Sequence, residues 1–397
     1  MKKTILILMS FLLIYTSCRK DISVTPVVNY NWTTSKRLEG NLSFKTKFGK
    51  PAANAKIMIY AGSTMKTIFD GYTDNFGNLD SLLFMIGDHY STITVVYGDE
   101  IQTLPLTDNS NKIRTISGDV TLSSYVPKEI PRADNHTYFP SQGEFGSLAF
   151  EDSWPWKGDF DFNDMVIDYN VDVKSNPSGK AISATYTLRP RGCGAGYTNG
   201  FGFQFDWLCP NCGSYVMTSD ITSVKRKIID ADGKQSNEVV LTSEFGNNNS
   251  SKPTYIIIDT SMSKHYHWNT TDNTRHSNGS IIVTIEFKSN HSVSHFDLPF
   301  SNPFIYINGN RGREVHMPYH NPTAKADLSW FSKGDAAANY KSKDSLNWVI
   351  DIEDTLVYPK EKINIENAYL QFKQWATTPN STLEWWEGTK VINNLYR

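Results

Sequence analysis

Residues 55–60 read Ala-Lys-Ile-Met-Ile-Tyr, so that small or branched apolar side chains occupy every second position. An alternation with a period of two predicts a β-strand with one buried face. The same period returns over residues 93–97, and turn-forming clusters lie at 49–51 (Gly-Lys-Pro) and 74–78 (Asp-Asn-Phe-Gly-Asn). Short strands separated by such turns predict a small β-sandwich over residues 37–126.

The sequence around these turns resembles the transthyretin-like or carboxypeptidase-regulatory-like β-sandwich repeat. The resemblance rests on residues 49–52 (Gly-Lys-Pro-Ala), 55–57 (Ala-Lys-Ile) and 72–74 (Tyr-Thr-Asp), followed by Gly77. It implies a spacer or binding module that carries no chemistry. We therefore assign no catalytic role to this sandwich.

A second, larger region follows the small sandwich and covers residues 127–397. From Asn364 onward, four apolar residues fall at helical spacing, which predicts one short amphipathic helix. The fold class that we expect is mainly β, with the small N-terminal sandwich followed by a larger β-sandwich or jelly-roll-like domain and a short C-terminal helix. The strands predicted in the larger region are 181–188, 201–208, 238–245, 254–259, 281–287 and 304–307.

The first 17 residues have the features of a secretory signal peptide. Two lysines follow Met1, and the apolar run at 5–14 is too short to cross a bilayer. Small residues precede Cys18 as in a lipobox, so we expect its thiol to be acylated and residues 18–36 to form a tether. An ordinary signal peptide with an incidental cysteine is the alternative, because Tyr15 stands where a leucine is usual.

Composition and charge restrict the class of partner. The signal peptide takes two of the 39 basic residues with it, so the mature chain has 37 against 41 acidic residues and a net charge near −4. Binding to nucleic acid needs a concentrated basic surface, which argues against that partner.

The expected partners are a membrane, through the lipid anchor, and a glycan or protein ligand. We expect an outer-membrane lipoprotein of the cell envelope, on the surface or the periplasmic face.

Three cysteines follow Cys18 in the chain, at positions 193, 209 and 212. An odd number in an oxidising compartment allows at most one disulfide among them. Cys209 and Cys212 have the spacing of a zinc half-site or a redox pair, but no second ligand pair lies near them in sequence. A local disulfide between Cys209 and Cys212 is the prediction.

Two histidine pairs have a spacing of four. His291 and His295 would lie too far apart on a strand to share an ion, and Pro318 breaks any helix between His316 and His320. We expect both pairs at surface or turn positions. His265 and His267 would share one face of a strand, but no third ligand lies near them in sequence.

The densest group of ligand-type side chains lies between residues 151 and 164. Asp159, Asp161 and Asn163 alternate with two phenylalanines, which in an extended segment puts three oxygen side chains on one side and two rings in the core. So many carboxylates repel one another unless a cation or basic residues neutralise them. Calcium prefers this set of oxygen ligands and is the predicted cofactor. The candidate ligands are Glu151, Asp152, Asp159, Asp161, Asn163 and Asp164.

Two structural readings of the same residues compete with calcium. The carboxylates can accept backbone hydrogen bonds in a loop rich in Asx turns. Alternatively, they pair with arginines such as Arg189, Arg191, Arg311 or Arg313. The spacing does not match an EF-hand, because Asp164 stands where the invariant glycine should be.

These residues resemble the LruC-domain family of bacterial lipoproteins, whose biochemical role is uncharacterised. Residues 150–166 resemble the opening motif of that family and residues 194–203 its glycine-rich strand. Residues 308–318 resemble a late hairpin, and 340–352 with 374–376 the C-terminal part. The resemblance covers the chain from about residue 140 onward, and it implies a secreted or outer-membrane lipoprotein without implying an activity.

Two hypotheses about function follow. The first is a non-catalytic, surface-anchored binding or structural module, stabilised by calcium at the acidic loop. The second is a polysaccharide hydrolase with two carboxylates, such as Glu151 and Asp164, as acid and base. A hydrolase needs two separated carboxyls across an open cleft, whereas a calcium site directs its oxygens toward one point. The position of the acids in the fold therefore separates the two hypotheses.

Overall fold

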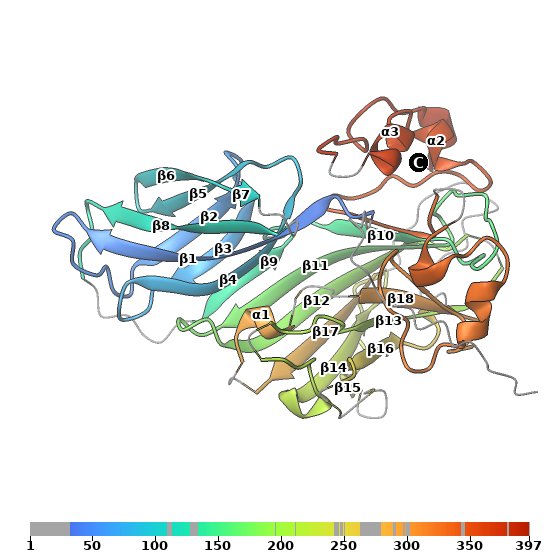
Figure 1. Cartoon of the computed structure of the whole chain (residues 1–397), viewed down its shortest axis with the longest axis horizontal. Coiled ribbons are helices and arrows are strands. Elements are labelled where there is room, and N and C mark those ends of the chain that lie inside the picture. The colour runs from blue at the N-terminus through green and yellow to red at the C-terminus, as the bar shows by residue number, and fades with distance from the viewer. Residues whose placement is uncertain are drawn as a thin grey trace, which may run out of the picture.

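The computed structural model of the chain is mainly β, with several sheets in sandwich-like layers and a few short helices, which confirms the predicted fold class (Figure 1). It describes residues 32–108, 113–127, 134–194, 196–210, 212–241, 246, 249, 251–262, 279–288, 291–296, 298, 302–342, 346–378 and 381–396.

The N-terminal strands form two sheets that enclose one apolar core. One sheet has the order β4-β1-β8-β7, and β3, β2, β5 and β6 are neighbours in the other. The alternating run at 55–60 forms β2, in which Ile57 and Ile59 are fully buried. The bounds are β1 (Ser35–Thr46), β2 (Lys56–Ala61), β3 (Thr67–Tyr72), β4 (Asn78–Gly87), β5 (Thr92–Tyr97), β6 (Glu100–Pro105), β7 (Thr107–Asp108) and β8 (Arg114–Leu122).

One sheet continues from the N-terminal region into the larger one. Strand β9 pairs with β3 through Phe69 and Thr137, and on its other side with β11. The order then runs β11-β12-β17-β14-β15, with β10 and β20 attached beside β11. The bounds are β9 (Asn135–Phe139), β10 (Gly146–Phe150), β11 (Met165–Ser175), β12 (Ala181–Gly192), β14 (Ile221–Ile229), β15 (Val239–Val240), β17 (Ser280–Phe287) and β20 (Val349–Ile352).

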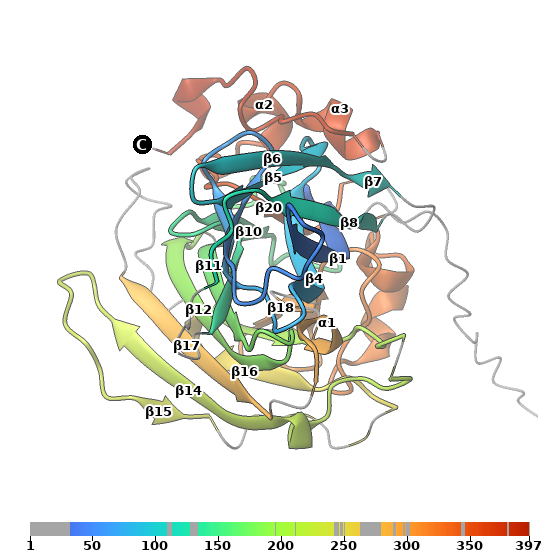
Figure 2. The ribbon, with the colours of Figure 1, turned by 90° about the vertical axis from the view of Figure 1, so that its left-hand side faces the viewer.

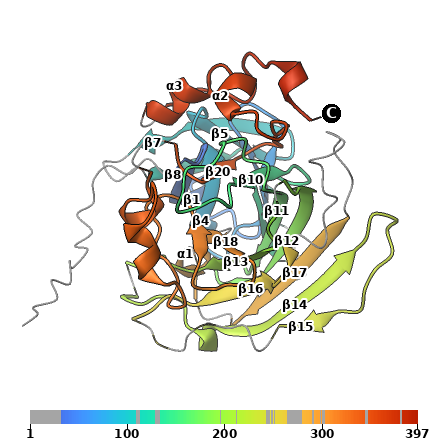
Figure 3. The same ribbon diagram turned by 90° about the vertical axis from the view of Figure 1, so that its right-hand side faces the viewer.

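A third sheet completes the larger sandwich. Its order is β16-β13-β18-β19, and it packs on the curved long sheet across the largest apolar core of the molecule (Figure 2, Figure 3). Phe203 of β13 and Tyr186 of β12 meet in this core with ring centroids 5.2 Å apart. The bounds are β13 (Asn199–Gln204), β16 (Tyr255–Asp259), β18 (Asn302–Ile307) and β19 (Glu314–His316).

The C-terminal segment covers one end of the long sheet with rings, in a group that we call the C-terminal aromatic cluster (Trp32, Phe160, Phe162, Phe372, Trp375 and Trp385). The single predicted helix is wrong in its continuity, because the chain bends between two short helices, α2 (Ile365–Ala368) and α3 (Phe372–Thr377). The apolar positions that predicted it are nevertheless all buried. Further short helical segments are α1 (Val293–Phe296) and the 3-10 turns Thr218–Asp220, Leu328–Ser332, Ala338–Tyr340 and Ile392–Asn394.

Five of the six strands predicted in the larger region are found, with shifted ends. The run at 238–245 is the exception: of its described residues, 238–241, only the two residues of β15 form a strand. Six strands of this region were not predicted, namely β9, β10, β11, β14, β19 and β20. In β14 the charged run at 225–227 interrupts the apolar pattern, because these residues lie on a partly exposed strand near the sheet edge.

Candidate metal centre

The acidic loop (residues 151–164) connects two paired strands. The last residue of β10, Phe150, is opposite the first residue of β11, Met165, in an antiparallel pair. The loop therefore leaves and re-enters the sheet at one point, and its two ends lie side by side. The backbone N–H of Asp152 donates to Asp164 Oδ2 at 2.8 Å across this closure.

The rings of the loop are buried as predicted, but its backbone is not extended. Phe160 and Phe162 are both in the C-terminal aromatic cluster, and both have left-handed backbone angles, with φ of 57° and 51°. A left-handed residue with a bulky side chain costs about 1–3 kcal/mol and persists only where its surroundings determine it. Here the burial of the two rings holds the backbone in this conformation.

Three of the six predicted ligands converge on one region. One carboxylate oxygen each from Glu151, Asp159 and Asp161 lies within 4.8 Å of the other two. Glu151 and Asp161 are fully buried, whereas Asp159 is exposed. The group therefore has a buried floor and one side that faces solvent.

Backbone amides fix the two buried acids in place. Phe162 N–H donates to Glu151 Oε1 at 2.7 Å. Lys362 N–H donates to Asp161 Oδ2 at 2.7 Å, from the segment that leads to α2. Asn163 N–H donates to Asp161 Oδ1 at 3.2 Å, a contact of the Asx-turn type. The bond from Lys362 thus links the loop to the C-terminal segment.

Two buried oxygens of the loop have no hydrogen-bond partner among the described residues. They are Glu151 Oε2 and Asn163 Oδ1, on side chains that are fully buried. Each faces a glycine: a Cβ on Gly158 would overlap Glu151 Oε2, and a Cβ on Gly194 would overlap Asn163 Oδ1. Because glycine has no side chain, no Cβ occupies the space in front of either oxygen.

The other predicted ligands lie beside this group. Asp152 Oδ2 accepts from Asn199 Nδ2 at 2.8 Å, and Asp164 accepts from the Asp152 amide, so the two acids form a neighbouring pair. Asn163 donates through Nδ2 to the Pro359 carbonyl at 3.2 Å. The sequence did not point to Asn199, because no local signal connects it to the loop.

The electrostatics of the loop favour a bound proton or a bound cation. Burial, and then the charges of Asp161 and Asp159, raise the pKa of Glu151 well above its usual value. Burial and the charge of Asp159 raise the pKa of Asp161 to about 8. Burial also raises the pKa of Asp164, with Asp152 as the next cause. A divalent cation would oppose each of these shifts.

The predicted arginine pairing is wrong within the described part of the chain. None of the four arginines forms an ion pair with an acid of the loop. Arg191 pairs with Asp168 at 2.7 Å, and Arg311 pairs with Glu314 at 2.6 Å. Arg313 donates to the Trp154 carbonyl at 2.8 Å, and Arg189 lies over the ring of Phe145. The carboxylates of the loop thus form no ion pair with a described arginine, although the charge of Arg313 opposes the rise in the pKa of Asp152.

The donor set fits a hard divalent cation. Calcium is bound by six to eight oxygens at about 2.3–2.6 Å, so opposite oxygens of its shell are about 5 Å apart. The three carboxylate oxygens within 4.8 Å of one another fall inside such a shell, and waters on the exposed side would complete it. Magnesium requires a smaller and stricter octahedron.

The other predicted site residues are in different places. Cys18 lies outside the described residues, as do His265 and His267. Cys209 and Cys212 form a disulfide, and Cys193 is buried outside it. Among the described residues no helix is long and apolar enough to cross a membrane.

The surface positions expected for the histidine pairs are wrong for two of the four residues. His295 and His316 are 1% and 0% exposed. His316 Nδ1 contacts Asn302 Oδ1 at 2.7 Å inside the third sheet. His295 lies on α1, a helical turn that stacks its ring on that of His291 with centroids 4.1 Å apart. The extended backbone assumed for His291 and His295 is therefore also wrong.

Comparisons with known proteins establish a family and a fold. The model of the family described as "Domain of unknown function (DUF4842)" matches residues 179–386, about half of the chain. That name differs from the LruC-domain family, so the resemblance to the latter stays a prediction. None of the curated proteins matches the chain.

Among solved structures, a candidate lipoprotein from Bacteroides ovatus has a similar fold. The match has a TM-score of 0.60 at 15% identity and covers 87% of this chain and 100% of that one. An identity this low shows the fold alone. A variant of BcpA, the major pilin subunit of Bacillus cereus, is matched at a TM-score of 0.15 and 9% identity, over 68% of this chain and 64% of that one, which carries no argument.

Proposed function

Because the chain belongs to the DUF4842 family, whose description assigns no activity, we propose a function from its own site: it is a non-catalytic lipoprotein of the cell envelope in which the acidic loop binds calcium. The ion holds the loop and, through it, the C-terminal aromatic cluster in position. The observation that carries the proposal is the buried, unpartnered Oε2 of Glu151.

An unpaired buried oxygen needs a partner that the protein does not supply. Leaving a buried acceptor without one costs about 1–3 kcal/mol, and more when the group is charged. The oxygen of Glu151 is on the carboxylate that also contributes to the group with Asp159 and Asp161. A calcium ion in that group would act as partner for the oxygen and as counter-charge for three acids at once.

The proposed role of the ion is structural, because the loop connects separate parts of the fold. Ile365 N–H at the start of α2 donates to the Phe160 carbonyl at 2.8 Å. Lys362 N–H binds Asp161 directly. An ion on Asp161 would therefore stabilise the attachment of the C-terminal helices to the sheet.

The alternative of a carboxylate-dependent polysaccharide hydrolase has less support. Glycosidases separate their two carboxyls by about 5–10 Å across an open cleft. Here Glu151 and Asp164 are both buried, and one oxygen each of Glu151, Asp159 and Asp161 lies within 4.8 Å of the others. A groove of about 1070 Å³ between Gln204 and Phe331 has no aspartate or glutamate among its described lining residues. A glycan or protein ligand for the module stays a prediction.

The lipid anchor is the second part of the proposal. It rests on the lipobox-like residues before Cys18 and agrees with the name of the Bacteroides ovatus protein that shares the fold. Cells expressing the protein would be grown with a labelled palmitate analogue. We expect label in the wild-type chain and none in Cys18→Ser, and equal labelling of both would refute the anchor.

Calcium binding is tested by thermal unfolding of the purified protein with excess calcium and with excess chelator. At 100 times the dissociation constant, the ion would stabilise the fold by about 2.7 kcal/mol, a rise in Tm of about 3–8 °C. Glu151→Gln and Asp161→Asn should remove most of this rise, because each keeps the shape of the side chain and removes the charge.

Asp351→Asn is the matched control. This aspartate is half-buried in β20, and its carboxyl accepts hydrogen bonds from Tyr169 and Thr33. We expect the variant to retain the full calcium response. An equal Tm with calcium and with chelator in the wild-type protein would end the calcium proposal.

A further inference from the structure

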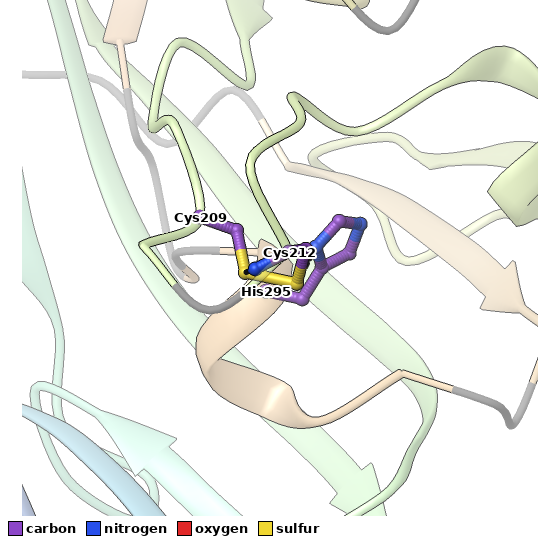
Figure 4. A group of neighbouring side chains, drawn as sticks. All are labelled: Cys209, Cys212 and His295. Atoms are coloured by element: carbon purple, nitrogen blue, oxygen red, sulfur yellow. Dashed lines mark hydrogen bonds between the residues drawn. A yellow bond between two sulfur atoms is a disulfide. The ribbon is translucent and has the colours of Figure 1, made fainter.

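A second group of ligand-type side chains lies away from the acidic loop, in what we call the sulfur–histidine cluster (Cys209, Cys212 and His295). Figure 4 shows the imidazole of His295 beside the disulfide. His295 Nδ1 is 3.3 Å from Cys212 Sγ, and one ligand atom from each of the three residues lies within 4.8 Å of the others. The fold joins segments that are more than 80 residues apart.

The second ring nitrogen of His295 faces a carboxylate. Nε2 is buried, without a hydrogen-bond partner within 3.5 Å, and its nearest acceptor is Asp220 Oδ2 at 3.6 Å. Asp220 is held in turn by Met217 N–H, which donates to Oδ2 at 2.8 Å. A histidine that binds a metal through one nitrogen usually donates through the other to a carboxylate, and this arrangement provides that carboxylate.

The loop around the cysteines is arranged to stabilise charge on sulfur. Cys212 N–H points at Cys209 Sγ at 3.1 Å. Gly213 N–H and Cys212 N–H both donate to the Cys209 carbonyl, at 2.9 and 3.3 Å, which holds the tight turn closed. An N–H aimed at sulfur gains strength when the sulfur is an anion, as in a metal-bound thiolate.

We propose that, once the disulfide is reduced, Cys209, Cys212 and His295 bind a zinc-class divalent ion, with Asp220 positioning the imidazole. Zinc prefers thiolate and imidazole ligands in a tetrahedron. With the usual bond lengths, a sulfur and a nitrogen ligand of one zinc ion lie about 3.5 Å apart. The observed 3.3 Å between Cys212 Sγ and His295 Nδ1 is already close to that edge.

The chemistry of the switch balances with an external dithiol as the reductant. The dithiol gives two electrons and two protons to the Cys209–Cys212 disulfide, which becomes two thiols, and the dithiol itself becomes a disulfide. The metal ion then displaces both thiol protons and binds the two thiolates. Cys212 is exposed, so the disulfide is accessible to the attacking thiolate, whereas Cys209 is buried.

Three protein ligands leave the fourth position of the tetrahedron open, as in catalytic rather than closed structural zinc sites. His291 does not need to fill it. Its Nε2 lies 3.3 Å from Asp220 Oδ1, and its ring stacks on His295, so it shares the positioning carboxylate. The fourth ligand would be a water or a small anion from solvent.

The test compares the reduced and the oxidised protein in the presence of excess calcium, which keeps the acidic loop from competing. The whole protein is reduced with a phosphine, transferred to anaerobic buffer and titrated with cobalt(II) as the probe, then with zinc as the competitor. We expect one equivalent of cobalt with thiolate-to-metal charge-transfer absorption, displaced by zinc. The oxidised protein should show no such absorption.

Variants separate the ligands from the positioning residue. Cys212→Ser, at an exposed position, should weaken zinc binding at least 100-fold and remove about half of the thiolate absorption. Asp220→Asn should keep the absorption and weaken zinc binding about 10–100-fold. Cys193→Ser, which changes a cysteine outside the cluster, and Glu151→Gln in the acidic loop should leave both unchanged.

The result that overturns the proposal is a reduced protein without thiolate-to-cobalt absorption. Equal zinc affinity in wild-type and Cys212→Ser would also overturn it. The inference does not depend on the calcium proposal, since the two sites share no residue and the Glu151→Gln variant tests them separately.

Discussion

The acidic loop and the sulfur–histidine cluster differ in how they are assembled. The acids come from 14 consecutive residues, carry only oxygen ligands and lie against a core of aromatic rings. The cluster joins a turn after β13 to α1, offers sulfur and nitrogen, and has one exposed sulfur. The ligands that are close in sequence are therefore also the ones that pack on the core of aromatic rings, and the ligands from distant segments are not. An ion at the loop should affect folding strongly, and an ion at the cluster should affect it weakly.

The largest effect should come from removing the ring on which the acidic loop rests. Phe162→Ala deletes a fully buried ring that contacts Trp32 and Phe372, with centroids 6.3 and 6.2 Å away. A Phe→Ala change in a core costs about 3–5 kcal/mol, which denaturant unfolding would measure. Calcium affinity should fall as well, because the loop loses its support.

Phe76→Ala is the control for that change, since its ring is 73% exposed and should alter stability by less than about 0.5 kcal/mol. If Phe162→Ala unfolded no more easily than Phe76→Ala, the loop would not be coupled to the core. The contrast between the two sites would then lose its basis.

The next largest effect is the pH dependence of stability, which the acidic loop should cause. A carboxyl whose folded pKa is raised binds its proton more tightly in the folded state, so stability falls as pH rises between the unfolded and folded values. With Asp161 at about 8, stability in chelator should fall between pH 4 and pH 8. Calcium competes with these protons, so its stabilising effect should be larger at pH 8 than at pH 5, by roughly 2 kcal/mol.

Asp351 provides a check on the sign. Burial raises its pKa to about 6, so its contribution to stability should fall between pH 4 and pH 6 and then stay level. This component should be the same with calcium and with chelator, and Asp351→Asn should remove it. A calcium effect that grew toward acid pH would contradict the assignment of the acidic loop.

A smaller effect is expected from filling the space in front of Asn163. Gly194→Ala puts a Cβ against Asn163 Oδ1, whereas Gly196→Ala meets no atom within 4 Å. Overpacking costs about 1–3 kcal/mol, so the first variant should lose about 1–2 kcal/mol and the second almost nothing. Calorimetric titration would show whether the calcium affinity falls with it. Equal behaviour of the two alanines would mean that the oxygen has no need of this space.

The smallest effect should come from opening the disulfide without a metal present. It closes a loop of only four residues, so the chain-entropy model gives at most about 2 kcal/mol for Cys212→Ser in chemical denaturation. We expect no change in the calcium response of that variant. A loss as large as that of Phe162→Ala would show that the cluster, too, is coupled to the core.

The sequence predicted those features that depend on neighbours in the chain. The alternation at Ile57 and Ile59 gave a strand, and the crowding between residues 151 and 164 gave a candidate site. Strand β14 was missed because Lys225, Arg226 and Lys227 hide its apolar period. A period of 3.6 residues also does not reveal that the C-terminal helix is interrupted between α2 and α3.

Contacts between distant segments left no local signal. The pairing of His295 with Cys212 spans 83 residues, and Asn199 meets Asp152 across 47. The left-handed backbone at Phe160 and Phe162 was likewise hidden, because the alternation of acids and rings suits a strand equally well. Only the packing of both rings into one core selects the observed turn.

The position of Trp32 determines which part of the fold a force on the N-terminal segment would act on first. Its ring lies in the C-terminal aromatic cluster, 5.6 Å from Phe372, and its carbonyl accepts from Asp351 N–H at 3.0 Å. For a protein tethered through the residues before Trp32, mechanical load would therefore enter at the C-terminal aromatic cluster before it reaches the N-terminal sandwich. The helices α2 and α3 lie at the end of the molecule opposite β14 and β15, so such a load would act first on the end that carries the two helices (Figure 3).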